Sequence, residues 1–258
     1  MLRGLYTAYT GMRNEQKRLD VISNNIANAA TVGYKTESVS NQSFDDALTL
    51  RIKDQTTPLK YDAIGGMNLG VKIGEVYTDY GQGSLNETEN TFDLAIAGKG
   101  FFNVAFTDAN GQTSVKYTRD GSFTMASDGY VVTSNGDNLL DVNGRPVRVN
   151  PNAAEISIDI NGNIYADNQY MGRIALTDFA DYDYIAKYGE NLYQPVNGAT
   201  QIGATGTIRQ GYLEQSNVDT VSEMVDLITV TRAYEANQKI IQSMDTMLDK
   251  AVNDVGRV

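Results

Sequence analysis

The sequence predicts an α+β protein in which long N- and C-terminal helices flank a central antiparallel β-rich domain. Apolar residues recur at alternating steps of three and four near both termini, as they do along one face of a helix. Asn-Gly and Asp-Gly dipeptides, which suit tight hairpin turns, crowd the middle of the chain. Of the 24 glycines, 20 lie between Gly65 and Gly211. We expect the two helices to pair as a coiled coil.

An N-terminal helix is expected from about Leu2 to Ala29, with a length of roughly 40 Å at 1.5 Å per residue. Gly4 and Gly11 each weaken it by about 1 kcal/mol relative to Ala, so its first turns should fray until they are packed. Its seam is a three–four series in which only Glu15 is polar: Leu5, Ala8, Met12, Glu15, Leu19, Ile22, Ile26 and Ala29.

The C-terminal helix should begin near Asp219, because Thr220 and Glu223 have the spacing of a capping box. At roughly 36 residues it would be about 55 Å long, which is typical of a coiled coil rather than of a globular helix. Its seam has nine positions, of which only Asn237 is polar: Leu227, Val230, Tyr234, Asn237, Ile241, Met244, Leu248, Ala251 and Val255.

A second apolar strip on the same helix consists of Val221, Met224, Val225 and Ile228. The N-terminal helix can cover only one seam, so this strip predicts contacts with further subunits. The alternative is an intramolecular helical hairpin that simply closes the domain. The length of the helices argues against it, because both cannot rest on one β domain.

We expect a β-rich outer domain over residues 66–212, with strands such as Ser114–Thr118, Tyr130–Thr133 and Ile156–Ile160 between its turns. Residues 1–36 and 213–258 would form the terminal helical assembly domain. Residues 37–65 would be a connector with a short helix around Phe44–Arg51.

The composition excludes several functions. Without Cys or His, the chain has no disulfide, no thiolate zinc site and no Ser-His-Asp triad. A net charge of −11 argues against nucleic-acid binding. No apolar run is long enough to span a membrane, and no cleavable signal peptide is evident at the start. Residues 1–36 carry +3 and residues 217–258 carry −3, which favours the approach of the two ends.

Other chemical interpretations have weaker support. Three Asp-x-Asn-Gly segments, beginning at Asp108, Asp141 and Asp159, could suggest calcium, but hairpin turns explain them. Gly98-Lys-Gly100 lacks the following helix of a nucleotide site and suits a bend between strands. The 16 tyrosines leave a carbohydrate-binding adhesin as an alternative, and paired carboxylates leave a cell-wall hydrolase. We expect no enzyme activity, catalytic residue, metal or cofactor.

The segment SNNIANAATVGYKT, residues 23–36, contains three Asn in five positions, followed by Gly33, which can take the left-handed conformation that stops a helix. This segment resembles the N-terminal signature of flagellar rod and hook proteins. The matching positions are Ala27, Asn28, Thr31, Gly33, Tyr34 and Lys35. The C-terminal helix is similar to that of the same family at Arg232, Tyr234, Glu235 and Asn237, and DLAIAGKGFFNV, YTRDGSFTMASDGYVV and ENLYQP resemble motifs of its β domain.

The resemblance implies an axial protein of the flagellar basal body that serves motility. Family members leave through the flagellar type III export apparatus, pair their terminal helices as an inner layer and polymerise helically into a hollow tube. The partners implied are further copies of the chain and other rod and hook proteins. QGYLEQSNVD and RAYEANQ resemble the distal rod members more than the proximal ones; a proximal rod or another hook-basal-body member is the alternative.

Overall fold

The computed structural model describes residues 2–45, 47–51, 62–68, 70–189 and 191–255. Its element order is helix, β-rich middle, helix, and all strand pairings among these residues are antiparallel, which confirms the predicted α+β class. The chain divides into two compact units. Unit 1 is Met1–Ile26, Glu37–Thr78 and Thr220–Val258, and unit 2 is Ala27–Thr36 and Asp79–Asp219.

Unit 1 contains both long helices. α1 covers Leu2–Ala27, and α2 covers Thr220–Lys250 and continues as a π-helical turn over Ala251–Val255. α2 starts where the capping box predicts. α1 ends two residues before Ala29, because Asn28 begins a turn in which its carbonyl and side-chain oxygens accept hydrogen bonds from Thr31 at 3.1 Å each.

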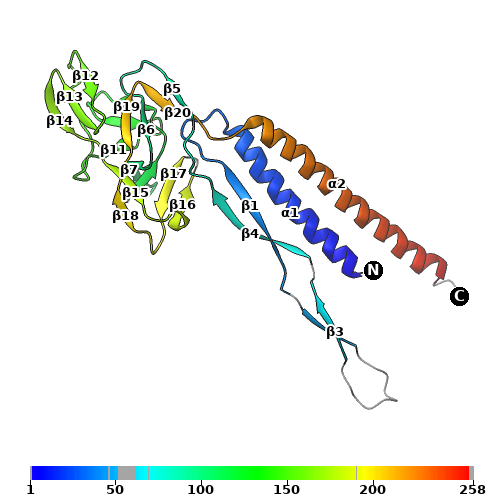
Figure 1. Ribbon diagram of the computed structural model, residues 1–258. Helices are drawn as coiled ribbons and strands as arrows, with labels where there is room; N and C mark the ends of the chain where they lie inside the picture. The colour runs from blue at the N-terminus through cyan, green and yellow to red at the C-terminus, as the bar shows by residue number, and fades with distance from the viewer. Residues whose placement is uncertain (1, 46, 52–61, 69, 190, 256–258) are drawn as a thin grey trace. The chain divides into compact units, whose positions relative to one another are not determined.

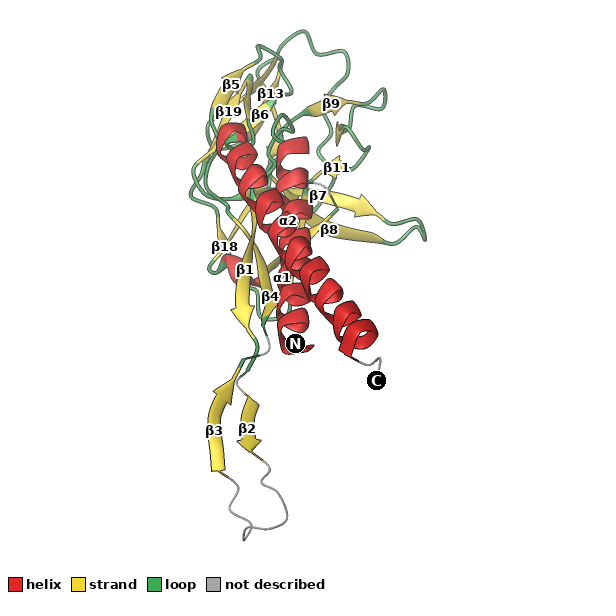
Figure 2. Ribbon diagram, turned by 90° about the vertical axis from the view of Figure 1, so that its right-hand side faces the viewer, coloured by secondary structure: helices red, strands yellow, loops and turns green. Residues whose placement is uncertain are grey.

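The remainder of unit 1 is a two-stranded ribbon (Figure 2). β1 (Glu37–Ser43) pairs with β4 (Val71–Thr78), and β2 (Ala47–Arg51) pairs with β3 (Asp62–Met67). The short helix expected around Phe44–Arg51 is therefore wrong. A segment of this length is marginal as an isolated helix, whereas pairing with β3 satisfies its backbone groups. Residues 52–61 of the expected connector lie outside the described residues.

Unit 2 contains β5 to β20. The bounds of its strands are β5 Leu85–Glu87, β6 Leu94–Ala97, β7 Phe101–Thr107, β8 Thr113–Thr118, β9 Phe123–Met125, β10 Val131–Thr133, β11 Asn138–Leu139, β12 Ile156–Ile158, β13 Asn163–Ala166, β14 Gln169–Arg173, β15 Leu176–Phe179, β16 Ile185–Tyr188, β17 Leu192–Pro195, β18 Gln201–Gly203, β19 Thr207–Gln210 and β20 Tyr212–Glu214. A 3-10 turn, Tyr182–Tyr184, precedes β16.

The largest sheet of unit 2 has nine strands. Its main path is β16-β17-β8-β7-β11-β10-β9, and β15 joins β7 to β18. Phe101 and Phe102 alternate along β7 and enter different apolar clusters. Phe102 packs with residues such as Leu94, Ile164 and Ile208, while Phe101 packs with aromatic residues such as Tyr193. Both faces of this sheet are therefore covered.

The three Asp-x-Asn-Gly segments form the same hairpin turn. In each, the Gly N–H donates to the Asp carbonyl at 2.8 Å, and Gly111, Gly144 and Gly162 have φ between 73° and 80°. The Asp carboxylate accepts from the next backbone N–H at 2.6–2.7 Å. The turn thus uses the oxygens that the calcium interpretation needs. Gly121, expected in a similar turn, instead lies against Leu94, whose carbonyl oxygen would be 1.6 Å from a Cβ at that position.

Candidate functional site

The predicted seam positions lie on the less exposed face of each helix. Ala8, Ile22 and Val230 are buried, at 5%, 8% and 2% exposure. The other described seam residues are half-buried: Leu5, Met12, Glu15, Leu19, Ile26, Ala29, Leu227, Tyr234, Asn237, Ile241, Met244, Leu248 and Ala251. Val255 falls in the π-helical turn, and its side chain lies outside the described part of the chain. The spacing alone thus predicts which face of each helix is covered.

α1 and α2 run antiparallel (Figure 1). A Cβ at Gly4 would be 2.4 Å from Met244 Cε, and a Cβ at Gly11 would be 3.1 Å from Asn237 Nδ2. Near the other end, Asn25 Nδ2 donates to Glu223 Oε1 at 3.1 Å. Residues 4, 11 and 25 of α1 thus face residues 244, 237 and 223 of α2, so every step along α1 corresponds to an equal step backwards along α2. The antiparallel register is therefore constant. The two glycines therefore leave room for the side chains of Met244 and Asn237, a role that helix propensity alone did not reveal.

The second apolar strip of α2 is exposed. Val221, Met224, Val225 and Ile228 are 69%, 54%, 58% and 51% exposed, and we call these four residues the outer strip. Arg232 and Glu235 follow at helical spacing from the outer strip and are also exposed. Large apolar side chains gathered in this way on a charged protein mark an interaction surface.

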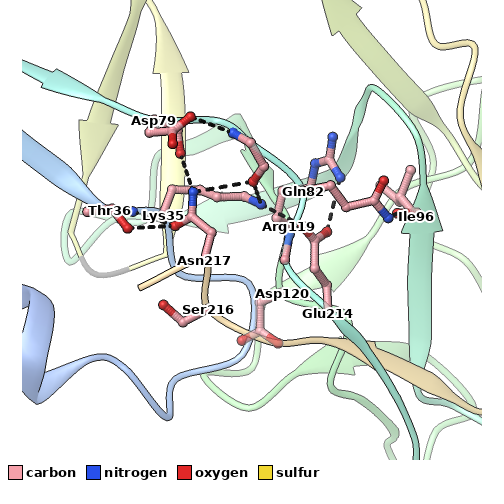
Figure 3. A network of polar contacts seen from close by, with 12 residues as sticks. Lys35, Thr36, Asp79, Gln82, Ile96, Arg119, Asp120, Glu214, Ser216 and Asn217 are labelled. Carbon is pink, nitrogen blue, oxygen red and sulfur yellow. Dashed lines mark hydrogen bonds and ion pairs between the residues drawn. The ribbon is translucent and has the colours of Figure 1, made fainter. Parts of the chain in front are cut away.

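A buried ionic cluster lies inside unit 2 (Figure 3). Lys35 and Glu214 are fully buried and Arg119 is 4% exposed. Lys35 Nζ donates to Glu214 Oε1 at 2.5 Å, and Arg119 Nη1 donates to Glu214 Oε2 at 3.0 Å. The Gly83 N–H also donates to Glu214, at 3.0 Å. We call Lys35, Arg119 and Glu214 the ionic cluster.

The ionic cluster contains two cations and one carboxylate, and backbone carbonyls accept from one further donor of each cation, whereas Arg119 Nε has no acceptor among the described residues. Lys35 Nζ donates to the Gly81 carbonyl at 2.7 Å, and Arg119 Nη2 to the Gly98 carbonyl at 2.9 Å. Burial lowers the pKa of Lys35 below its ordinary value, although the Glu214 carboxylate opposes this shift. An unpaired charge here would be very costly, so the three residues depend on one another.

Two asparagines, Asn217 in unit 2 and Asn25 in unit 1, each hydrogen-bond to chain segments that are distant in sequence but belong to the same unit. In unit 2, Asn217 Oδ1 accepts from the Thr36 N–H and hydroxyl at 2.8 Å each, and its Nδ2 donates to the Asp79 carbonyl at 2.9 Å (Figure 3). In unit 1, Asn25 bonds the Glu37 backbone in both directions, at 2.8 and 3.1 Å.

The family-motif residues around Gly33 are packed inside unit 2. Tyr34 is 1% exposed, and Lys187 Nζ lies 4.2 Å from its ring centroid. Gly33 has φ of 68°, as expected, but it lies six residues beyond α1 and therefore does not end that helix. Its N–H donates to the Glu214 carbonyl at 2.8 Å, and a Cβ would lie 2.5 Å from the Arg119 backbone. Position 33 therefore requires glycine for two reasons: the positive φ and the lack of space for a Cβ beside the Arg119 backbone.

Gly33→Ala is therefore expected to destabilise the protein more than Gly136→Ala. Both positions have positive φ, but nothing lies within 4 Å of a Cβ at Gly136. The left-handed conformation costs a non-glycine residue about 1–2 kcal/mol, and the overlap at Gly33 adds about 1–3 kcal/mol. Urea unfolding of the two variants measures the difference, and equal losses would contradict a close approach at Gly33.

The remaining motif residues are more exposed. Asn28 and Thr31 are half-buried in the turn after α1, and Ala27 is exposed. Sequence reasoning did not select Arg119, Glu214, Asn217 or Asn25 as site residues. Arg119, Glu214 and Asn217 stand in the segments YTRDG and GYLEQSNVD, but no spacing signal pairs Lys35 with a carboxylate 179 positions away.

Three family models match the chain. The flagella basal body rod protein model matches residues 5–35, the flagellar hook protein FlgE/F/G D1 domain matches 95–166, and the flagellar basal body rod FlgEFG protein C-terminal model matches 209–254. The first match includes Lys35, the second includes Arg119 and the third includes Glu214. Each member of the ionic cluster therefore comes from a different matched region.

Curated relatives match over nearly the full chain. The flagellar basal-body rod protein FlgG of Bacillus subtilis (strain 168) is 35% identical over 271 residues, which is 98% of this chain and 99% of the relative. FlgG of Buchnera aphidicola subsp. Schizaphis graminum is 34% identical over 97% of this chain and 98% of its own. The flagellar basal-body rod protein FlgF of Caulobacter vibrioides is 34% identical over 100% of both chains.

Proposed function

The chain belongs to the flagellar basal-body rod and hook family, close to FlgG, and from that membership we propose that it polymerises helically into a hollow axial shaft. It is a structural subunit of the flagellar basal-body rod and is located in the basal body. No helix among the described residues has the length and apolar character needed to cross a membrane. Relatives of this kind are structural proteins rather than enzymes.

The observation that carries polymerisation is the outer strip. Its four side chains are more than half exposed on α2, while the seam on the same helix is covered. Fully burying a side chain of this size contributes about 1.5–3 kcal/mol, so occupation of the outer strip by a neighbouring copy would strongly favour assembly. A contact between different surfaces of identical subunits extends into a helical filament unless its rotation closes a ring.

We also propose that α1 and α2 pair as a coiled coil within each subunit. The three–four seams, the constant antiparallel register and the approach of Met244 and Asn237 to the glycines of α1 support this pairing. The proposed assembly residues are those of the two seams. The division into a terminal assembly domain (1–36 and 213–258), a connector (37–65) and an outer domain (66–212) remains part of the same proposal.

Distal rod position and export through the flagellar type III apparatus complete the proposal. Similarity to FlgG supports the first, and membership of the rod family supports the second. The adhesin and hydrolase alternatives have no comparable support, and the Asp-x-Asn-Gly carboxylates already serve as turn acceptors.

Electron microscopy of the concentrated protein tests polymerisation. Wild-type protein is expected to form tubes, whereas Ile241→Asp and Leu248→Asp should abolish them, because each places a charge in the covered seam. Unit 2 should still fold in both variants, and circular dichroism with proteolysis measures this. Tubes of normal appearance from both variants would contradict the proposed role of the seam.

A further inference from the structure

A pocket in unit 2 has oxygen acceptors without matching donors. Its volume is about 410 Å³, and it lies between the turn after β10 and the segments preceding β9 and β17. The polar residues that carry the argument are Asp137, Asp120, Asn191 and Thr118, and Phe106 and Tyr188 contribute an apolar wall.

Asp137 is the central acceptor. It is only 9% exposed, and among the residues that the structure describes, no side chain or backbone N–H donates to its carboxylate. Its backbone is fixed instead: its N–H donates to the Thr133 hydroxyl at 3.1 Å, and its carbonyl accepts from the Thr133 N–H at 2.9 Å. Burial raises the pKa of the Asp137 carboxyl, because lost hydration is not replaced.

Asn191 holds segments of the pocket wall together. Its Oδ1 is buried and has no hydrogen-bond donor within the described parts of the chain, while its Nδ2 donates to the Val32 carbonyl at 3.0 Å. That donor bond fixes which side-chain atom is the oxygen. The Thr118 hydroxyl donates to the Asn191 carbonyl at 2.8 Å and holds the two walls together.

A cation with several donors can neutralise Asp137 and hydrogen-bond to both carboxylates of the pocket at once. Asp120 adds a further carboxylate, of which one oxygen already accepts from Ser122. The nearby cation Lys116 donates to Gln194 at 2.7 Å rather than to these carboxylates. A calcium ion needs six to eight oxygen ligands, and the rings of Phe106 and Tyr188 cannot provide them. A guanidinium has five donors in a plane, and the methylenes that carry it pack on apolar walls.

We propose that this pocket binds an arginine side chain of a neighbouring copy of the chain. The pocket chemistry stands by itself, whereas the identity of the neighbour rests on the proposed polymerisation. Unit 2 carries exposed arginines, Arg145 and Arg209, that a second copy could present.

Calorimetric titration of the full chain tests the pocket with N-acetyl-L-arginine amide as the probe. Binding is expected with a dissociation constant on the order of 1 mM, as befits one side chain, and at least tenfold weaker binding is expected for Asp137→Asn. Asp128→Asn, which removes an exposed carboxylate of the same unit, should bind as the wild type does. The neutral isostere N-acetyl-L-citrulline amide should not bind.

The unfolding midpoint of free Asp137→Asn should equal or exceed that of the wild type, because the change removes an unpaired buried charge. A lower midpoint, equal binding of the two probes, or binding of calcium chloride without binding of arginine would overturn the pocket assignment.

A separate experiment tests whether the arginine comes from a neighbouring copy. Asp137→Asn should raise the protein concentration needed for tube formation at least tenfold, and an unchanged concentration would overturn the neighbouring copy as the source. Arginine binding by a wild-type protein that forms no tubes would refute polymerisation while leaving the pocket chemistry intact.

Discussion

Lys35→Met is expected to lower the free energy of unfolding by about 1.5–3 kcal/mol, the usual loss when a buried hydrogen bond to a charged group is removed. Lys35 is fully buried, and its ammonium group joins the Glu214 carboxylate to the Gly81 carbonyl. Methionine fills much of the same volume but supplies no donor. The Gly81 carbonyl then loses a donor, and among the described residues Glu214 keeps Arg119 as its one cationic partner. Urea unfolding of the monomer measures the loss.

Two further variants show whether that loss comes from the ionic cluster. Lys99→Met removes an exposed lysine and should change stability by no more than about 0.5 kcal/mol. In a Glu214→Gln background, Lys35→Met should cost much less than in the wild type, because the pair is already broken. Equal costs in the two backgrounds, or a wild-type midpoint for Lys35→Met, would show that the cluster is not a stabilising unit.

Val225→Asp is expected to prevent polymerisation while leaving the monomer as stable as the wild type. Val225 is 58% exposed, so its replacement disturbs little packing within one chain. In a polymer that covers the outer strip, the change would bury an unpaired carboxylate, at a cost of about 3–5 kcal/mol. That corresponds to a rise of roughly 100-fold or more in the concentration needed for assembly. Sedimentation velocity over a concentration series measures this rise.

The matched control is Gln238→Asp, which adds the same charge to an exposed position of α2 outside the outer strip. It should shift the assembly concentration far less than Val225→Asp. A helical hairpin that only closes the domain would leave both variants indistinguishable from wild-type protein. Loss of monomer stability in Val225→Asp would show that the outer strip serves the fold of the single chain.

Local sequence patterns predicted the elements that depend on local physics. The three–four series located both helices and their covered faces, because neighbouring turns of one helix determine which residues share a face. The Asn-Gly turns were also predicted from the sequence, because glycine readily adopts the positive φ observed at Gly111, Gly144 and Gly162. The role of Gly4 and Gly11 was not predicted. Helix propensity indicated only that they weaken the first turns of α1, whereas in the structure they lie against Met244 and Asn237 of α2.

Features that depend on distant segments could not be predicted in this way. The pairing of β2 with β3 replaced the helix expected at Phe44–Arg51, because strand pairing depends on a partner beyond the local window. The ionic cluster combines residues 35, 119 and 214, and a buried lysine has no local signature. The resemblance selected Lys35 as a motif residue, but only the fold showed that Glu214 and Arg119 surround its charge.

The most direct test of polymerisation through the outer strip uses a single thiol at Val225. Because the chain has no cysteine, Val225→Cys provides one reactive site, and its reaction rate with a maleimide can be measured in monomers and in tubes. The rate is predicted to fall at least tenfold on assembly, as neighbouring copies cover the position. A thiol at Gln112, an exposed residue between the Asp108–Gly111 turn and β8, provides the comparison in unit 2. Equal rates for Val225→Cys in monomers and tubes would contradict the account.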